Sequence, residues 1–519
     1  MKNKFTTNLV FNISALIIII IVIIGAIIPD TFGKVSNRLF NFTTIYFGWF
    51  YLLAVFVIAL FLIGLAISRF GSIRLGGEKS KPEFSFFTWI GMLFSAGMGV
   101  GLVFWGVAEP MSHFFDTPFS HLEGQTVEAA RTAIGYSFFH WGISQWAIFA
   151  IVGLVIGFMQ FRKKKNGLVS TALENVAGDK PSVKNTIDIL SVIATVMGVA
   201  TSLGLGALQM AGGLNVVFDF NNTIFLQLMI IGIVFILYML SATTGVDKGI
   251  KILSNLNLGL AIGLTLLVFI MGPSLFILET FTLGIGDYIT EFIGYSLRLQ
   301  PYRGGTWVRD WTIFYWAWAI AWSPFVGAFV ARVSKGRTIR EYIAGVMIIP
   351  PIIACFWIAT FGGTALWFDL NKGTNIAEVV NQDITQALFQ VFENIPFGNV
   401  FSIISILLIL TFLVTSADSA TFVLASMTNN GMTNPPLFSK MTWGILMSLI
   451  ASILLYAGGL EALQTASLIA ALPFILILLS LIVSIYKHLR LEPIPISERD
   501  MRRFRHIEKA IQRKKEEKK

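Results

Sequence analysis

The sequence contains little of what a water-soluble protein needs on its surface. Only 13% of its 519 residues are charged, against about 25% in an average soluble domain, while 55% are hydrophobic. The single cysteine, Cys355, excludes an internal disulfide and a multi-cysteine metal site. These shortages exclude a cytosolic enzyme, a disordered chain and a disulfide-stapled secreted domain. A polytopic membrane protein is the class that remains.

Long apolar runs are plentiful. A helix needs about 20 apolar residues to cross the hydrocarbon core of a bilayer. Twelve such runs can be found, at residues 11–29, 44–68, 86–108, 136–160, 187–217, 222–242, 254–275, 311–333, 342–368, 396–427, 441–458 and 461–486. The first run leads into Pro29 without a small-residue cleavage pattern, so we interpret it as a retained helix and not as a signal peptide. We therefore predict an all-α membrane protein with twelve transmembrane helices.

The basic residues give these helices an orientation. If the N-terminus is cytoplasmic, most of the 38 lysines and arginines fall on the cytoplasmic side, as the positive-inside rule requires. The net charge of +9 is then a signal of topology and does not call for nucleic acid as a partner. We expect a multi-pass protein of the cell membrane with both termini in the cytoplasm.

Two segments are too polar to span the bilayer. The stretch 276–299 mixes apolar residues with Glu279, Asp287 and Glu291, which predicts an amphipathic helix along the outer membrane surface; an ordinary structured loop is the alternative. The basic tail is either a solvated extension or a segment that contacts anionic lipid headgroups. The predicted division of the chain is 1–85 (helices 1 and 2), 86–275 (five helices), 276–310 (connecting helix), 311–486 (five helices) and 487–519 (cytoplasmic tail).

Two spans contain residues that weaken helices. Gly97, Gly99 and Gly101 fall in the third span, and Pro324 falls in the eighth. Units 3–7 and 8–12 each contain five helices, an odd number, so they must have opposite orientations. Interrupted helices at matching positions of inverted units are typical of transporters with a binding site near the midplane. Close helix packing through the Gly97/Gly101 pair is the alternative interpretation.

Aromatic residues gather on one side of spans four and eight. The two clusters are Trp141, Trp146 and Phe149, and Tyr315, Trp318, Trp322 and Phe325. Neither run contains a carboxylate, and tryptophan faces bind quaternary ammonium groups well. An aromatic box of this kind fits a zwitterion or a trimethylammonium cation, whereas the alternative is simple packing. We assign Trp307 and Trp311, near the outer boundary, to the interfacial belt.

Polar residues inside spans are functional candidates. Thr415, Ser416 and Asp418 interrupt the apolar run of span ten, and hydroxyl oxygens suit a hard cation such as Na⁺; helix–helix hydrogen bonding is the alternative. His140 is either a proton relay or, more simply, a hydrogen-bonded core histidine. We find no cluster of His, Cys and carboxylates with metal-ligand or catalytic-triad spacing, and we predict no enzymatic activity.

Several longer motifs together resemble the betaine/carnitine/choline transporter (BCCT) family, over about residues 10–490. They are GMGVGLVFWGVAEP (97–110), HWG (140–142), WTIFYWAW (311–318), WSPFVG (322–327) and ARVSKGRTIRE (331–341), supported by 202–207 and 415–423. The resemblance implies a LeuT-like five-plus-five inverted repeat, a homotrimer and a bacterial plasma membrane. It also implies sodium-coupled import of compatible solutes such as glycine betaine under osmotic stress, without a cofactor.

The resemblance further implies the site residues. Trp141, Trp146 and Trp322 would form the aromatic box with Trp318 at its flank, and backbone of Gly97, Met98, Gly99 and Gly101 would line the carboxylate end. Sodium would bind the carbonyls of Ser95 and Met98 and the hydroxyls of Thr415 and Ser416. Phe325 and Thr195 are further sodium candidates. A second sodium site in span five would use a pair of threonines, of which Thr195 is present, whereas Val199 stands at the partner position.

Two box positions depart from the family pattern. Where the family usually reads Trp-Ala-Trp-Trp, this chain has Trp316-Ala-Trp-Ala319, and a box tyrosine is replaced by Phe149. The loss of one indole would weaken the binding of a trimethylammonium group by about 1–2 kcal/mol and would open space. The substrate can therefore be bulkier than glycine betaine or bound differently. The alternatives are a sodium-independent exchanger, a transporter of choline, carnitine or another zwitterion, and a membrane sensor that does not translocate.

Overall fold

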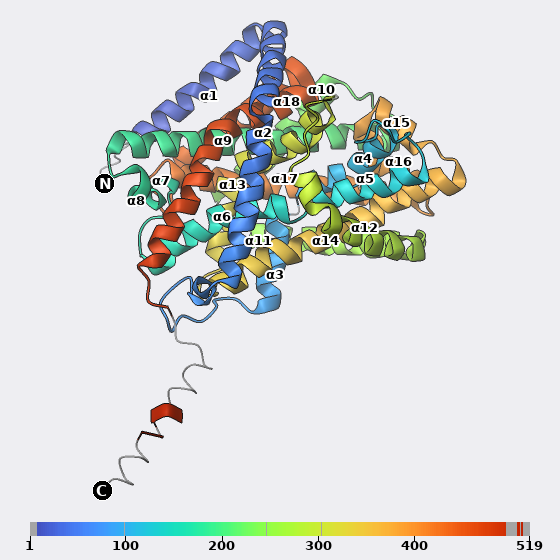
Figure 1. The fold of residues 1–519 in the computed structure, drawn as a ribbon. Helices are drawn as coiled ribbons and strands as arrows, with labels where there is room; N and C mark the ends of the chain where they lie inside the picture. Colours follow the sequence, from blue (N-terminus) through green and yellow to red (C-terminus); the bar gives the residue numbers. More distant parts are fainter. Residues whose placement is uncertain are drawn as a thin grey trace.

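The computed structural model describes residues 8–97, 99–244, 247–302, 304–494, 506–508 and 510–511, and it is all-helical in this part of the chain (Figure 1). The long helices are α1 (Leu9–Ile27), α2 (Pro29–Ile67), α9 (Pro181–Phe218), α10 (Ile224–Thr244), α11 (Asp247–Met271), α12 (Ser274–Ser296), α13 (Phe314–Val333), α14 (Ile339–Lys372), α17 (Gly398–Met427) and α18 (Leu437–Arg490). The predicted all-α class is confirmed.

Shorter helices complete the fold. They are α3 (Phe86–Gly97), α4 (Val100–Phe115), α5 (Val127–His140), α6 (Ile143–Gly157), α7 (Val169–Ala172), α8 (Glu174–Ala177), α15 (Ile376–Gln382) and α16 (Ala387–Glu393). Four short 3₁₀ or π segments are η1 (Arg69–Ser72), η2 (Phe158–Arg162), η3 (Arg309–Ile313) and η4 (Ile384–Gln386).

Ten helical segments of the described chain are long and apolar enough to cross a membrane. The predicted runs 441–458 and 461–486 lie in one of them, α18, whose backbone leaves the helical region at Gly458 and Gly459. Neither α3 nor α4 reaches a membrane-spanning length alone, with 12 and 16 residues. The count of twelve spans therefore stays a prediction, as does the cytoplasmic location of the termini.

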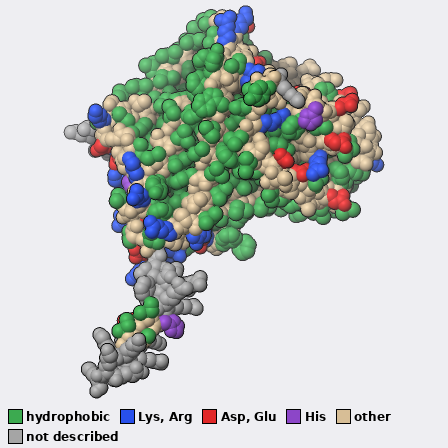
Figure 2. Space-filling model, viewed as in Figure 1, with side chains coloured by type: hydrophobic (Ala, Val, Ile, Leu, Met, Phe, Trp, Pro, Cys, Tyr) green, Lys and Arg blue, Asp and Glu red, His purple; other side chains and the backbone are tan. Residues whose placement is uncertain are grey.

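The outer surface agrees with a lipid environment. On the face seen in Figure 2, apolar side chains form a broad band, and lysines and arginines gather along its left edge. Near the end of α18, the carboxylate of Glu492 pairs with Arg162 at 2.5 Å and with Lys163 at 2.6 Å. These ion pairs join the end of the last long helix to the segment that follows α6.

The segment between the two predicted units is a helix. The prediction for 276–299 is confirmed in this respect by α12, which lies beside α5 and α14 (Figure 1). Arg131 of α5 forms a two-pronged ion pair with Asp287 of α12, with both N–O distances at 2.7 Å, and the rings of Tyr136 and Tyr295 stack 3.9 Å apart. The location of α12 on the membrane surface stays a prediction. Ile289 on this helix is 71% exposed.

The structure breaks one helix where the sequence predicts a break and another where it does not. The third span ends as α3 at Gly97 and resumes as α4 at Val100, with Gly99 in an extended conformation. The fourth span is also broken, between α5 and α6 at Trp141 and Gly142.

The predicted interruption of the eighth span is wrong. Helix α13 runs without a break past Pro324. A proline has no N–H for the carbonyl four residues before it, here that of Ile320. The Ser323 hydroxyl donates to this carbonyl at 2.7 Å and replaces the missing bond. The irregularity of this span lies instead at its start, in the π segment η3.

Candidate functional site

A narrow buried cleft lies where α4, α9, α13 and α17 meet. Its lining includes Gly99 and Gly101 near the start of α4, Val199 and Ser202 on α9, Trp322 and Phe325 on α13, and Ser416 on α17. The free space is about 10 Å³, which is about what one water molecule needs. The structure therefore brings predicted residues of spans three, eight and ten to one place, around a space smaller than a solute.

The glycine segment presents backbone donors at this cleft. Gly99, the N-cap of α4, has extended backbone angles (φ −114°, ψ −165°), and no side chain in the described part of the chain caps the helix. The first N–H groups of a helix have no partner within it, and they carry the positive end of the helix dipole. A helix start of this kind favours a carboxylate. Gly97 ends α3, and Met98 lies outside the described residues.

The predicted aromatic residues form one continuous chain of rings. Trp318 stacks on Trp322 with centroids 5.9 Å apart and planes 8° apart, and Trp141 meets Trp318 edge to face at 6.1 Å. On the other side, Trp322 contacts Phe149 at 5.8 Å, and Phe149 contacts Trp146 at 5.7 Å. All five side chains are buried, so none faces lipid. Of these five rings, the cleft itself is lined only by Trp322.

Trp318 is fixed by its neighbours. Phe314 lies parallel to it on one side at 6.1 Å, and Trp322 lies on the other. A Cβ at Gly101 would sit 2.2 Å from Cη2 of this indole, so the ring fits only because position 101 has no side chain. Ala319, the departure from the family pattern, is fully buried and adds no ring to this stack.

The two hydroxyls predicted for sodium have different surroundings. Ser416 lines the cleft together with Gly99. The Thr415 hydroxyl accepts a hydrogen bond from the Asn257 amide on α11 at 3.1 Å and donates to the Thr411 carbonyl at 2.9 Å. Ser95 lies in the last turn of α3. The sodium site they would form stays a prediction.

The remaining sodium candidates also differ in whether they line the cleft. Phe325 lines the cleft, whereas the hydroxyl of Thr195 donates to the Ser191 carbonyl of its own helix at 2.8 Å. Val199, which stands at the partner position of Thr195, also lines the cleft. Asp418 accepts a hydrogen bond from Ser241 of α10 at 2.7 Å and is not among the residues that line the cleft.

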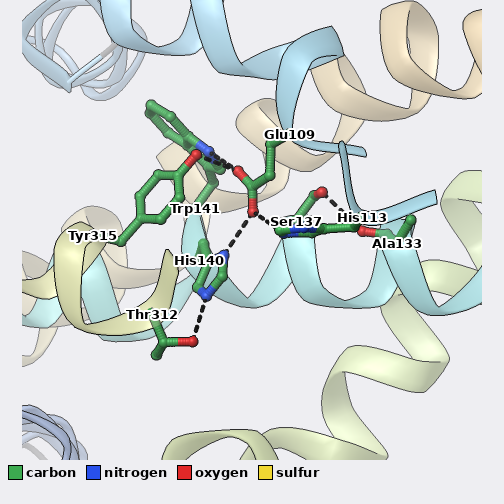
Figure 3. Close-up of polar contacts among 8 residues, drawn as sticks. All are labelled: Glu109, His113, Ala133, Ser137, His140, Trp141, Thr312 and Tyr315. Carbon is green, nitrogen blue, oxygen red and sulfur yellow. Dashed lines mark hydrogen bonds and ion pairs between the residues drawn. The ribbon is translucent and has the colours of Figure 1, made fainter. Parts of the chain in front are cut away.

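A polar cluster that the sequence did not reveal surrounds Glu109 and includes Trp141, one ring of the aromatic chain (Figure 3). Glu109, which is fully buried on α4, accepts hydrogen bonds from the Trp141 indole at 3.0 Å and from the Tyr315 hydroxyl. Its other oxygen faces Nδ1 of His140 at 2.6 Å and Nε2 of His113 at 3.2 Å. Neither aromatic run contains a carboxylate, but the structure brings Glu109 of α4 to Trp141 and Tyr315.

The expectation that histidines and carboxylates do not cluster is wrong. Glu109, His113 and His140 each offer one ligand atom, and these atoms lie within 4.8 Å of one another. Two atoms bound to one zinc ion at about 2.1 Å each in tetrahedral geometry would stand more than about 3 Å apart, so the 2.6 Å contact to His140 is a hydrogen bond. The spacing of Glu109 and His113, four residues apart on one helix, was the signal available in the sequence.

Two tryptophans assigned to the interfacial belt belong to this cluster. Trp307 is only 7% exposed, and its ring lies 4.7 Å from that of His113. Trp311 packs against His113 at 4.5 Å and against Trp105 at 5.5 Å. Both rings pack against His113 inside the protein, so their assignment to the interfacial belt is wrong.

Comparison with known proteins adds independent information. Residues 9–494 match the model of the BCCT, betaine/carnitine/choline family transporter. The chain is 61% identical over 93% of its length to the ectoine/hydroxyectoine transporter of Virgibacillus pantothenticus, of which 96% is covered. It is 46% identical over 90% of its length to the glycine betaine transporter OpuD of Bacillus subtilis, of which 91% is covered. The helical membrane fold and these matches show that the chain is a member of the betaine/carnitine/choline transporter family, and hence a transporter and not an enzyme.

Proposed function

We propose that this transporter imports a zwitterionic compatible solute into a bacterial cell by sodium-coupled alternating access, with ectoine or hydroxyectoine as the first candidates and glycine betaine as the second. One observation carries the proposal. The stacked indoles of Trp318 and Trp322 and the uncapped start of α4 meet at one buried site. Aromatic faces attract a cation and helix N–H groups attract a carboxylate, and a zwitterion presents both charges on one small molecule.

The composition of the aromatic chain favours ectoine over glycine betaine. A trimethylammonium head is spherical and is best held by rings on several sides, whereas Ala319 removes one of the rings that the family pattern supplies. The cation of ectoine is a flat cyclic amidinium, which can stack on one or two indole faces. It also has N–H groups that need acceptors, and the hydroxyls of Ser202 and Ser416 lie at the cleft. The name of the 61% identical relative points the same way.

The closed cleft supports alternating access. Its free space of about 10 Å³ holds no solute of this size, so the helices that form it have to separate during transport. Sodium would contribute by binding oxygens of α17 and of the broken third span at once, which favours the closed arrangement. Ser416 and Gly99 line the same cleft, which supports this part of the proposal. We keep the homotrimer as an expectation of the family.

Transport by the purified protein tests the proposal. Proteoliposomes are given labelled ectoine, glycine betaine or choline, with an inward gradient of either Na⁺ or K⁺. We expect accumulation of ectoine or glycine betaine with Na⁺ only. Equal uptake in K⁺ would identify a sodium-independent exchanger, and tight binding without accumulation would identify a sensor.

The sodium site has its own test. The double variant Thr415→Ala with Ser416→Ala is expected to abolish stimulation by Na⁺ while the protein stays folded by size-exclusion chromatography. Ser419→Ala on the same helix is the matched control and should keep full stimulation. Unchanged sodium dependence in the double variant would refute the placement.

A further inference from the structure

Glu109 is an unusual residue for the inside of a membrane protein. Its side chain is 0% exposed, and a buried carboxylate is costly unless its oxygens are fully hydrogen-bonded. Four donors surround it: the Trp141 indole, the Tyr315 hydroxyl and the rings of His113 and His140 (Figure 3). They come from α4, from the end of α5 with the break that follows it, and from α13.

Trp141 depends on this carboxylate more than a residue inside a regular helix would. It occupies the break between α5 and α6, where the backbone leaves the helical pattern. Its side chain is anchored by the 3.0 Å bond from its indole N–H to Glu109. From there, ring contacts run from Trp141 to Trp318 at 6.1 Å and from Trp318 to Trp322 at 5.9 Å.

The second anchored ring is Tyr315. Its hydroxyl donates to the same carboxylate oxygen as Trp141 does, and its ring stacks on His140 at 4.6 Å. His140 is itself held at its other nitrogen by the Thr312 hydroxyl at 2.9 Å. Tyr315 also meets Trp141 edge to face at 5.8 Å. One carboxylate therefore fixes two neighbouring rings and the histidine behind them.

We propose that Glu109 is a positioning residue for the transport site: its carboxylate fixes Trp141 and Tyr315, and these rings hold Trp318 against Trp322. The inference rests on the proposed function, in which Trp322 faces the cation of the solute and Trp318 stacks on Trp322. Glu109 does not touch the solute, since it is not among the residues that line the cleft. It acts through the Trp141 indole.

A carboxylate suits this position better than a neutral group of the same shape. Its two oxygens only accept, and hydrogen bonds to a charged acceptor are about twice as strong as those to a neutral one. In a glutamine, one neutral oxygen accepts from the Trp141 indole and the Tyr315 hydroxyl, and the amide faces the two histidines. The bond that holds Trp141 against Trp318 is therefore weakened.

A double-mutant cycle tests whether Glu109 acts through Trp141. Uptake of labelled ectoine or glycine betaine is measured for Glu109→Gln, Trp141→Phe and the combined variant, with thermal unfolding as the folding control. We expect Glu109→Gln to raise KM about tenfold, and to raise it less than about threefold when Trp141 is already Phe, because coupled residues are non-additive. In the control background Trp49→Phe, which changes an exposed ring outside this chain of rings, Glu109→Gln should keep its full effect.

The opposite results overturn the inference. An equal factor in the Trp141→Phe and wild-type backgrounds would mean that Glu109 acts elsewhere. An effect of a chelator on wild-type uptake equal to that of Glu109→Gln would make the cluster a metal site. If Glu109→Gln does not fold, Glu109→Asp takes its place, because its carboxylate is withdrawn by one methylene from the indole and should raise KM in the same way.

A measurement without substrate separates this inference from the proposed function. Near-ultraviolet circular dichroism reports how tightly indole rings are held. Glu109→Gln should lose a part of the tryptophan signal that Trp141→Phe also loses, and the combined variant should lose no more. If wild-type protein accumulates no solute, the proposed function fails, while this spectrum still supports or refutes the positioning role.

Discussion

Replacement of Gly101 by alanine tests the aromatic site most directly. The added Cβ would lie 2.2 Å from Cη2 of Trp318, whereas an ordinary carbon–carbon contact is about 3.5–4.0 Å. The indole would have to retreat by about 1 Å or more. It cannot do so freely, because Phe314 and Trp322 lie parallel to it on its two sides.

The size of the effect follows from the packing. Overpacking of a tight core costs about 1–3 kcal/mol, and each 1.4 kcal/mol corresponds to about a factor of ten. If the strain falls on the rings that bind the solute, KM should rise by about 5- to 150-fold. Folding stability is a poorer readout, since alanine in a helix is favoured over glycine by about 1 kcal/mol and offsets part of the strain.

The assay is solute uptake in proteoliposomes, with two comparisons. Gly91→Ala lies in α3 of the same span, where a Cβ meets nothing within 4 Å, and it should leave KM unchanged. Trp318→Phe removes the atom that Gly101→Ala would strike, so the alanine should have little further effect in that background. A normal KM for Gly101→Ala alone, or an undiminished effect beside Trp318→Phe, would refute the reasoning.

Three further predictions concern other parts of the molecule. Trp322→Leu should raise KM about tenfold through the loss of one cation-binding face, whereas Trp49→Leu, at a 53% exposed ring, should not change it; equal effects in uptake would mean that the stack is only packing. Tyr288→Phe removes the hydroxyl that accepts the hydrogen bond from the Ile143 N–H at 2.7 Å, so calorimetry should show that the free energy of unfolding falls by about 1–3 kcal/mol. An unchanged melting temperature would mean that water replaces the hydroxyl and would contradict this prediction. Burial alone would raise the pKa of Glu492, but its two ion pairs outweigh burial and hold the pKa below 4.5, so they stabilise the fold fully above pH 4.5 and are lost as the pH falls through the lowered pKa. The gap in melting temperature between wild type and Glu492→Gln should therefore close in acid, and a gap that stays constant would contradict this assignment.

Much of the candidate site could be predicted, because its residues carry local signals. Three glycines in five residues predicted the break at Gly99, which the structure shows as an extended N-cap. The aromatic residues of spans four and eight were expected to meet, and Trp141, Trp318 and Trp322 lie in one chain of rings. The residues alone left sodium binding and helix packing open for hydroxyls such as that of Thr415, and only the resemblance chose between them.

The errors share one physical cause, which is that each position depends on a contact that the local sequence pattern does not show. Pro324 removes one backbone bond, but whether the helix breaks depends on a substitute donor, and Ser323 supplies it. In the sequence, Glu109 is only one residue of the motif 97–110. Its four hydrogen-bond partners include Tyr315, which lies 206 residues away in sequence. The sequence predicted Trp307 and Trp311 at the membrane boundary, whereas in the structure both rings pack against His113.

The sequence by itself determined the membrane class, the positions of the long apolar helices and the family, because hydrophobic run length and extended motifs are properties of neighbouring residues. Only the tertiary structure decided that span four breaks at Trp141 and Gly142, that α13 stays whole, and that Glu109 fixes the rings of the site. Such features depend on hydrogen bonds between helices that are far apart in the sequence, and neither composition nor local spacing predicts which donor will pair with which acceptor.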